Sequence, residues 1–176
     1  MIERGYPRNR YRIPAIVCCA LFLLSSVACA ASNDFAALTW DGSVVGILDG
    51  DTLDVLHKRH PERIRLYGID CPEKRQAFGK MAKLMTSALV FGRTVTVKPH
   101  DTDRYKRVVA EVFLPDGTNL NRQLVQDGWC WWYRKYAPGD TVLEGLENDA
   151  RESKKGLWVD PHPIPPWEWR KAIRHQ

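Results

Sequence analysis

The sequence predicts an α+β fold, in which five strands form a small β-barrel of the OB type and three helices are added to it. The prediction rests on β-rich runs separated by turn signals, on a helix expected after the third run, and on two helices expected near the C-terminal end. The chain has 176 residues, which leaves room for one ordinary domain. Proteins with many functions share this order of elements, so function has to be argued from the site.

The first three strands are expected to form a meander. Residues 43–48 are apolar enough for a strand, and Asp49-Gly50 is a strong turn signal. Residues 52–56 alternate apolar and polar side chains, as a returning strand does. A polar turn over residues 58–61 then precedes the third strand, which is expected over residues 63–69.

A helix is expected over residues 76–91, and Gly92 ends it. Its predicted buried stripe consists of apolar side chains spaced mostly three or four apart: Phe78, Met81, Met85, Ala88 and Leu89. Two further strands are expected over residues 94–98 and 108–114. The second of these ends in a turn with the sequence Pro-Asp-Gly, residues 115–117.

Two more helices are expected in the C-terminal half. The first covers residues 120–126 and is closed by Gly128. Residues 141–144, Thr-Val-Leu-Glu, match a capping box that opens the last helix. This helix is expected to end at residues 154–156 and to bury Leu143, Leu146, Ala150 and Leu157. The tail after Pro161 is rich in Pro and Trp, and we expect it to lie extended against the body.

Residues 1–30 have the pattern of an export signal. Four arginines precede an apolar run over residues 13–27, which ends at the small-x-small sequence of residues 28–30. The run is shorter than the roughly twenty residues of a membrane span. We therefore expect cleavage near Ala30 and export to the periplasm or the medium, with an uncleaved N-terminal membrane anchor as the alternative. The rest divides into a lead (31–42), a main domain (43–158) and a Pro/Trp-rich tail (159–176).

The net charge limits the kinds of partner that the chain can bind, and its cysteines bear on the compartment in which it works. Residues 1–30 contribute +3 to the formal net charge of +5, so the remaining chain carries +2 and is no general polycation. If it binds nucleic acid, its positive charge must be concentrated in a groove. Cys71 and Cys130 are the cysteines that follow residue 30. In an oxidising compartment they can form a disulfide, and two buried free thiols are the alternative.

Three short segments concentrate acids and arginines at strand boundaries: residues 49–52, 65–73 and 101–107. Taken alone, each has a structural explanation, as a hairpin turn, a loop start and a solvated charged loop. Their joint occurrence in this order indicates a site. The histidines are too scattered for a zinc site.

Together the motifs D-G-D-T, R-L-x-G-I-D-x-P-E and D-R-Y-x-R resemble the staphylococcal nuclease (thermonuclease-like) family, over residues 44–158. The resemblance implies an endonuclease that depends on Ca²⁺ and hydrolyses phosphodiester bonds of DNA and RNA. Low sequence specificity and products with 3′-phosphates are implied as well. DNA and RNA are then the partners, and we expect a monomer without a stable protein partner.

The resemblance also implies a role for each matching residue. Asp51, Asp70 and the backbone carbonyl of Cys71 match the calcium ligands. Arg65 and Arg107 match the arginines that hold the scissile phosphate, in keeping with the two parallel hydrogen bonds that a guanidinium donates. Glu73, Arg104 and Tyr105 have counterparts too: Glu73 matches the acid beside the attacking water, and the other two match contacts to a neighbouring phosphate.

The chain departs from the family pattern at several positions. Lys106 stands where a glycine is usual, which adds charge and removes a flexible φ. Tyr136 aligns with one of two substrate-stacking tyrosines, and Arg134 stands at the other, so both are candidate substrate-binding residues. The neighbouring tryptophans 129, 131 and 132 are expected to be core residues. A disulfide between Cys71 and Cys130 is a hypothesis; it would tether this aromatic segment to the site.

Two alternatives to this function stay open on the sequence alone. The first is a non-catalytic OB-type nucleic-acid-binding domain, although family members of that kind typically lack the acids and arginines found here. The second is an enzyme that uses manganese or magnesium, since oxygen ligands also accept those ions. A cleavage assay with calcium and then with a chelator distinguishes the calcium-dependent nuclease from the non-catalytic domain.

Overall fold

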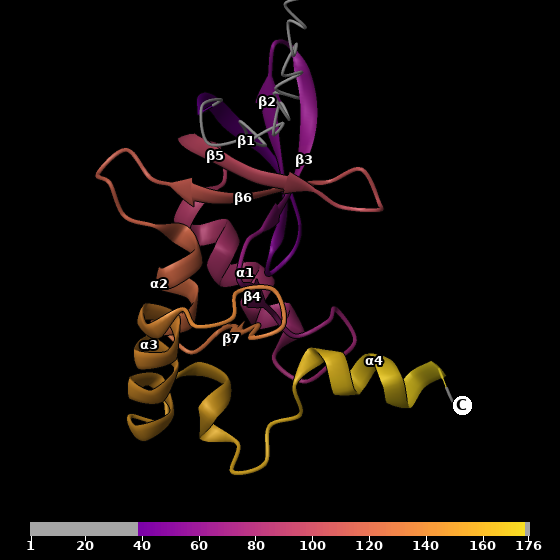
Figure 1. Ribbon diagram of the computed structural model, residues 1–176, viewed down its shortest axis with the longest axis vertical. Coiled ribbons are helices and arrows are strands. Elements are labelled where there is room, and N and C mark those ends of the chain that lie inside the picture. The colour runs from indigo at the N-terminus through magenta and orange to yellow at the C-terminus, as the bar shows by residue number, and fades with distance from the viewer. Residues whose placement is uncertain (1–38, 175–176) are drawn as a thin grey trace, which may run out of the picture. The chain divides into compact units, whose positions relative to one another are not determined.

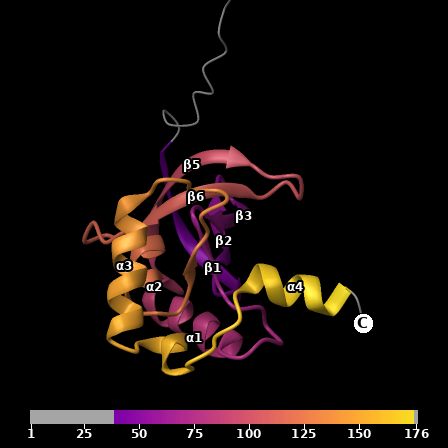
Figure 2. The same cartoon turned by 60° about the horizontal axis from the view of Figure 1, so that its bottom comes forward.

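The computed structural model describes residues 39–174, and in them five strands close into a barrel (Figures 1 and 2). The hydrogen-bonded order is β1-β2-β3-β6-β5, and β5 pairs with β1 to close the ring. The strands are β1 (Trp40–Asp49), β2 (Thr52–His57), β3 (His60–Leu66), β5 (Thr94–Thr102) and β6 (Val108–Phe113). The predicted five-stranded barrel is therefore confirmed. The export signal predicted over residues 1–30 lies outside the described residues.

β3 begins earlier than the sequence predicted, and its neighbours in the barrel are not all its neighbours in sequence. The turn between β2 and β3 has only two residues, Lys58 and Arg59, both at positive φ (46° and 71°). Primed turns of this kind match the twist of paired strands, so β3 begins earlier than expected, at His60. β3 then pairs in parallel with β6, with Ile64 beside Val108. This non-local pairing joins the first three strands to β6 and β5 in the ring.

The expected third strand is interrupted after Leu66. Gly68 takes a φ of 76°, and the chain leaves the barrel there. The next residues form β4 (Ile69–Asp70), which pairs antiparallel with β7 (Trp131–Trp132) in a separate two-stranded sheet. This small sheet carries Asp70 out of the barrel ladder and places it beside the aromatic segment.

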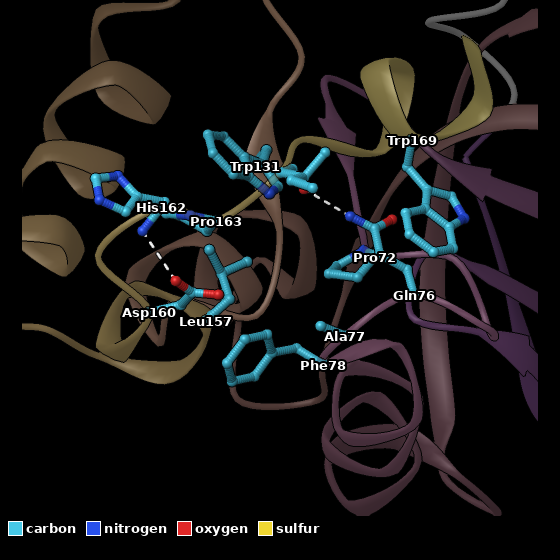
Figure 3. Close-up of a pocket in the computed structure, with 11 residues that line it drawn as sticks. Pro72, Gln76, Ala77, Phe78, Trp131, Leu157, Asp160, His162, Pro163 and Trp169 are labelled. Carbon is cyan, nitrogen blue, oxygen red and sulfur yellow. Dashed lines mark hydrogen bonds between the residues drawn. The ribbon is translucent and has the colours of Figure 1, made fainter. Parts of the chain in front are cut away.

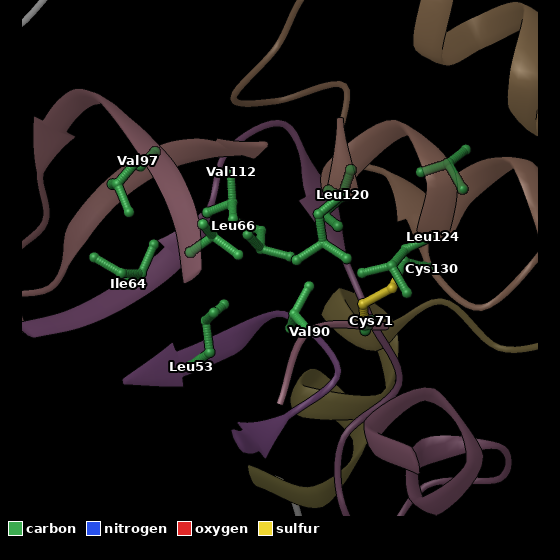
Figure 4. Close-up of a cluster of buried hydrophobic side chains, with 14 of the residues drawn as sticks. Leu53, Ile64, Leu66, Cys71, Val90, Val97, Val112, Leu120, Leu124 and Cys130 are labelled. Carbon is green, nitrogen blue, oxygen red and sulfur yellow. A yellow bond between two sulfur atoms is a disulfide. The ribbon is translucent and has the colours of Figure 1, made fainter. Parts of the chain in front are cut away.

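The core fills the barrel and continues beneath it (Figure 4). Leu53, Ile64 and Leu66 point inward from β2 and β3 and are at most 1% exposed. Val90 of α1 (Gly79–Val90) and Leu124 of α2 (Leu120–Gln126) extend the same cluster toward a disulfide between Cys71 and Cys130. Burying these side chains is the main favourable term in folding.

Helix α1 (Gly79–Val90) buries a different face from the one predicted. Its buried positions include Ala82, Thr86 and Val90, whereas Met81 is 43% exposed. The reason is close packing, because the Thr86 hydroxyl donates to the carbonyl oxygen of Gly50 at 2.7 Å. Only small side chains fit between the helix and this turn, so the larger ones point outward.

Helices α2 (Leu120–Gln126) and α3 (Thr141–Glu152) pack side by side (Figure 2). The bounds of α2 agree with the prediction. The predicted capping box is wrong, because Asp140 and not Thr141 caps α3, and its carboxylate accepts from the backbone N–H groups of Val142 and Leu143. The helix ends before residue 154, and Leu157 lies in a separate 3₁₀ turn (Gly156–Val159).

The tail is not extended throughout, which corrects the prediction. It ends in a fourth helix, α4 (Pro166–Arg174). Pro166 is the first residue of that helix, where a missing N–H costs nothing. Among residues 39–174, no helix combines the length and the apolar character needed to span a bilayer.

Candidate active site

The centre of the site is a pair of buried aspartates joined by one arginine. Asp51 lies in the turn between β1 and β2, and Asp70 lies at the end of β4. Arg65 stands on β3 and pairs with Thr52 of β2. Since Asp51 directly precedes Thr52, the Arg65 side chain lies close to this turn. Its Nη2 atom is 3.1 Å from Oδ2 of Asp51 and 3.0 Å from Oδ1 of Asp70. The predicted acids and the first predicted arginine are thus brought together.

Cys71 is held against the same acids. Its backbone N–H donates to Oδ2 of Asp51 at 2.7 Å, and its sulfur forms a disulfide with Cys130, with the Cα atoms 4.1 Å apart. Gly50 packs directly against Cys71 and Ala82. A Cβ atom added at Gly50 would lie 2.7 Å from the Cβ of Cys71 and 2.9 Å from the Cβ of Ala82. A glycine is therefore required here for close approach.

The acid cluster holds more negative charge than its burial favours. Burial raises the pKa of Asp49 to about 7, and the charge of Asp51 adds to the effect. Burial also raises the pKa of Asp70 to about 6, against the hydrogen bond from Arg170. A hard divalent cation relieves such repulsion and takes oxygen ligands, so the two carboxylates suit such an ion, and the ligand roles of Asp51, Asp70 and the Cys71 carbonyl stay predictions.

Glu73 follows on a tight turn. Its backbone N–H donates to Oε1 of Gln76 at 3.1 Å, and its carbonyl accepts from the Gln76 N–H at 2.8 Å. Gly79 is needed beneath this turn, because a Cβ there would overlap the Glu73 carbonyl. The glutamate side chain is 37% exposed, so water reaches it.

The structure adds a second arginine that the sequence did not indicate. Arg170 of α4 contacts Asp70 at 2.6 Å and Glu73 at 2.7 Å. Burial opposes its charge, but hydrogen bonds to the two carboxylates outweigh this and raise its pKa above the ordinary value. No local pattern in a Pro/Trp-rich tail reveals such a contact, because it depends on where the tail docks.

The loop between β5 and β6 holds the second predicted arginine. Asp103 accepts hydrogen bonds from the backbone N–H of Tyr105 (2.9 Å) and of Arg107 (3.0 Å). Its carboxylate also binds the Arg107 guanidinium at 2.7 Å, so within residues 39–174 that guanidinium is paired with the loop and not with Asp51 or Asp70. Lys106 takes a φ of 62°, which keeps the backbone in the region where glycine is usual.

The remaining predicted substrate contacts are exposed. Tyr105 is 63% exposed, with the Arg104 guanidinium 4.8 Å from its ring centroid. Tyr136 is 58% exposed and packs edge-on against Tyr133. Arg134 stacks over Trp132 and pairs with a buried acid, Glu147, at 2.9 Å. For all four residues the substrate-binding role stays a prediction.

The tryptophans of the aromatic segment are core, as expected. Trp131 and Trp132 are 6% and 5% exposed, and Trp129 packs against the main core. Trp131 also lines a small cavity, of about 90 Å³, between the turn after Cys71 and the tail (Figure 3). Gln76 crosses this region, where its Nε2 donates to the Ile164 carbonyl at 2.5 Å. The tail is thereby fastened to the turn that carries Glu73.

Comparison with known proteins identifies the family of this chain. The family model described as staphylococcal nuclease homologue matches residues 63–160. An uncharacterized endonuclease of Escherichia coli is 48% identical over 129 residues, covering 73% of this chain and 84% of its own. A micrococcal nuclease of Shigella flexneri is 40% identical over 168 residues, covering 89% of this chain and 97% of its own. The chain belongs to the staphylococcal nuclease family and is an endonuclease, a hydrolase whose substrate is nucleic acid.

Proposed function

We propose that the protein is a calcium-dependent endonuclease that hydrolyses phosphodiester bonds of both DNA and RNA with low sequence specificity and leaves 3′-phosphates. The observation that carries the proposal is the contact of Arg65 with both Asp51 and Asp70. It joins a phosphate-binding cation to two buried carboxylates that fit a divalent ion. Low specificity follows because the proposed contacts are to metal and phosphate and not to base edges.

The metal is assigned to Asp51, Asp70 and the backbone carbonyl of Cys71. Calcium bound there supplies Lewis-acid polarisation of the phosphate and lowers the pKa of the attacking water. The arginine donates paired hydrogen bonds to non-bridging phosphate oxygens and strengthens them as negative charge builds up in the transition state.

Glu73 is the residue that orients or deprotonates the attacking water. Its carboxylate lies near Asp70, since Arg170 contacts both acids, and it stays open to solvent. Arg107 is the second phosphate arginine, and it reaches the substrate from the loop that follows β5. Parallel pairing supports this placement, because Val109, two residues after Arg107, lies beside Arg65.

The rest of the substrate is proposed to lie along exposed aromatic and cationic side chains. Arg104 and Tyr105 bind a neighbouring phosphate, and Tyr136 stacks on a base, with Arg134 beside it. These groups can engage an exposed strand better than a paired duplex. We therefore expect faster cleavage of single-stranded or frayed nucleic acid than of intact duplex.

Cleavage of supercoiled plasmid and of single-stranded RNA tests the proposal. With calcium, the purified protein is expected to nick and then degrade both substrates, and a calcium chelator is expected to stop it. The DNA ends should resist extension by a polymerase until a phosphatase removes the 3′-phosphate. Cleavage that persists in the chelator would contradict the calcium assignment. DNA ends that a polymerase extends without phosphatase treatment would contradict the 3′-phosphate assignment.

Export is part of the same proposal and is supported by the pattern of residues 1–30. The full chain, expressed in a Gram-negative host, is expected to yield a protein that begins close to residue 31 in the periplasm or the medium. N-terminal sequencing checks this. Recovery of the intact N-terminus in the membrane fraction would favour the anchored alternative.

A further inference from the structure

The guanidinium of Arg170 lies inside the acid cluster. Nη2 is 2.6 Å from Oδ2 of Asp70, while Nη1 is 3.3 Å from its Oδ1 and 2.7 Å from Oε1 of Glu73. Both oxygens of Asp70 therefore accept from this one side chain. The Asp70 side chain is 2% exposed, so the guanidinium replaces water around it.

The tail is built to hold Arg170 in this place. One helical turn earlier, Trp167 stacks on Tyr133, with ring centroids 5.2 Å apart and planes within 6°. The same indole meets Trp131 edge-on at 5.8 Å. Residues three apart lie on one side of a helix, so the docking of Trp167 directs Arg170 toward the acids. α4 is thus fixed by aromatic contacts outside the acid cluster.

The contacts of Arg170 conflict with the proposed metal site. The proposed function needs oxygens of Asp70 for the ion and the carboxylate of Glu73 for the water. Arg65 touches only Oδ1 of Asp70, whereas Arg170 takes Oδ2 as well, so a divalent ion that needs an Asp70 oxygen has to displace Arg170 from this buried carboxylate. Since Arg170 also binds Glu73, it blocks both groups at once.

We propose that Arg170 is an exchangeable internal cation of the active site: it neutralises Asp70 and Glu73 in the metal-free protein and leaves them when a divalent ion binds. This inference rests on the proposed metal site. Its consequence is a lower apparent calcium affinity, because the ion binds only the fraction of molecules in which Arg170 has moved away. The metal-free enzyme, in turn, is spared a set of unpaired buried charges.

Calorimetric titration with calcium ions, without nucleic acid, tests this inference. Arg170→Gln is expected to bind calcium about tenfold more tightly than the unmodified chain, because charge-assisted hydrogen bonds no longer compete. Lys171→Gln is the matched control, since Lys171 is the exposed next residue of α4 and loses the same charge. The control is expected to leave the affinity within twofold.

A second variant frees Arg170 without removing any charge. Trp167→Ala deletes the stacking on Tyr133 and should undock α4, so it is also expected to tighten calcium binding. Thermal unfolding provides an independent readout. In the absence of metal, Arg170→Gln is expected to melt at a lower temperature than Lys171→Gln, because Asp70 loses its partner. Calcium should raise the melting temperature of Arg170→Gln by more than it raises that of the unmodified chain.

The outcomes are distinct. If calcium binds the unmodified chain and Arg170→Gln equally, or binds the variant more weakly, the exchange is overturned and the metal site stands. If calcium binds neither protein, the metal site of the proposed function fails, and the exchange fails with it. Tighter binding by both Arg170→Gln and Trp167→Ala, with Lys171→Gln unchanged, supports the exchange.

Discussion

Arg65 joins two acids that belong to different parts of the chain, and one exposed arginine on the same strand offers a control for it. Arg63 pairs with Asp54 at 3.0 Å, and its side chain is 50% exposed. Arg65 is only 14% exposed and contacts both buried aspartates. The two residues share a strand and a charge, so they differ mainly in what they touch.

Replacing Arg65 with alanine is expected to lower kcat/KM about a thousandfold, or about 4 kcal/mol of transition-state stabilisation. Arg65→Lys should recover only a small part of this, because an ammonium cannot donate two parallel bonds to phosphate. Arg63→Ala should stay within about twofold of the unmodified enzyme. Steady-state cleavage kinetics check this, and near-normal turnover of Arg65→Ala would contradict the phosphate role.

Glu147 is a residue whose importance the sequence did not indicate. It is 0% exposed, and its carboxylate accepts from the Trp132 backbone N–H at 3.1 Å and from Arg134 at 2.9 Å. Arg151 lies 3.3 Å from the same oxygen as Arg134. A glutamate in an amphipathic helix is usually solvated, so its burial shows only when the partner elements are in place.

Glu147→Ala is expected to destabilise the fold by about 1–3 kcal/mol, because it leaves the buried Trp132 N–H without an acceptor, while Arg134 and Arg151 are open to solvent. Glu144→Ala, on the exposed side of the same helix, should cost less than about 1 kcal/mol. Denaturant unfolding measures both. Equal losses for the two variants would mean that the buried pairings contribute little.

Among single elements, the loop between β5 and β6 shows how one side chain can order a segment. Asp103 accepts from two backbone N–H groups and from the Arg107 guanidinium. Burial acts against the carboxylate, but the bonds from Arg107 hold the pKa of Asp103 below its usual value. The ionised acid therefore stabilises the folded loop.

Asp103→Ala is expected to cost about 1–2 kcal/mol at neutral pH through lost hydrogen bonds. Because the folded pKa is depressed, this stabilisation is present above the unfolded value, near 4, and is lost as the pH falls through the lower folded value. Denaturant unfolding at pH 7 and pH 3 checks this: the difference in unfolding free energy between the unmodified chain and Asp103→Ala should be smaller at pH 3. A difference that grows in acid would contradict the assignment.

The elements also show what periodicity can and cannot predict. Turn signals and β-rich runs located every barrel strand, because those signals are local. The prediction of the buried face of α1 was wrong, because that face is set by the close approach of Thr86 to Gly50. The helical tail was missed because a Pro/Trp-rich composition favours extended chain, whereas the stacking of Trp167 on Tyr133 holds α4 in place.

On the scale of the whole molecule, the site gathers residues from segments far apart in sequence. Motif resemblance assigned Asp51, Arg65, Asp70 and Glu73, and the structure places them around one centre. The parallel pairing of β3 with β6 and the approach of Arg170 had no local signal. Both depend on long-range packing, which a single sequence does not display.

The disulfide is the covalent link of this assembly, since Cys71 and Cys130 are 59 residues apart. Replacing both with alanine is expected to cost about 3–4 kcal/mol, because the unfolded chain regains the freedom of a long loop. Calcium binding should weaken as well, since Cys71 is a proposed ligand through its carbonyl. Unfolding and calorimetry of the double variant measure the two effects, and unchanged stability would mean that packing alone holds the segment.

The closed hydrogen-bonding ring has one more consequence. A sheet with open edges offers unpaired N–H and C=O groups to other chains, which favours aggregation. Here β5 pairs with β1, so each of the five barrel strands has a neighbour on both sides. Within residues 39–174, the sheet outside the ring consists of two strands of two residues each. The part of the fold formed by residues 39–174 therefore offers few open strand edges on which another chain could pair.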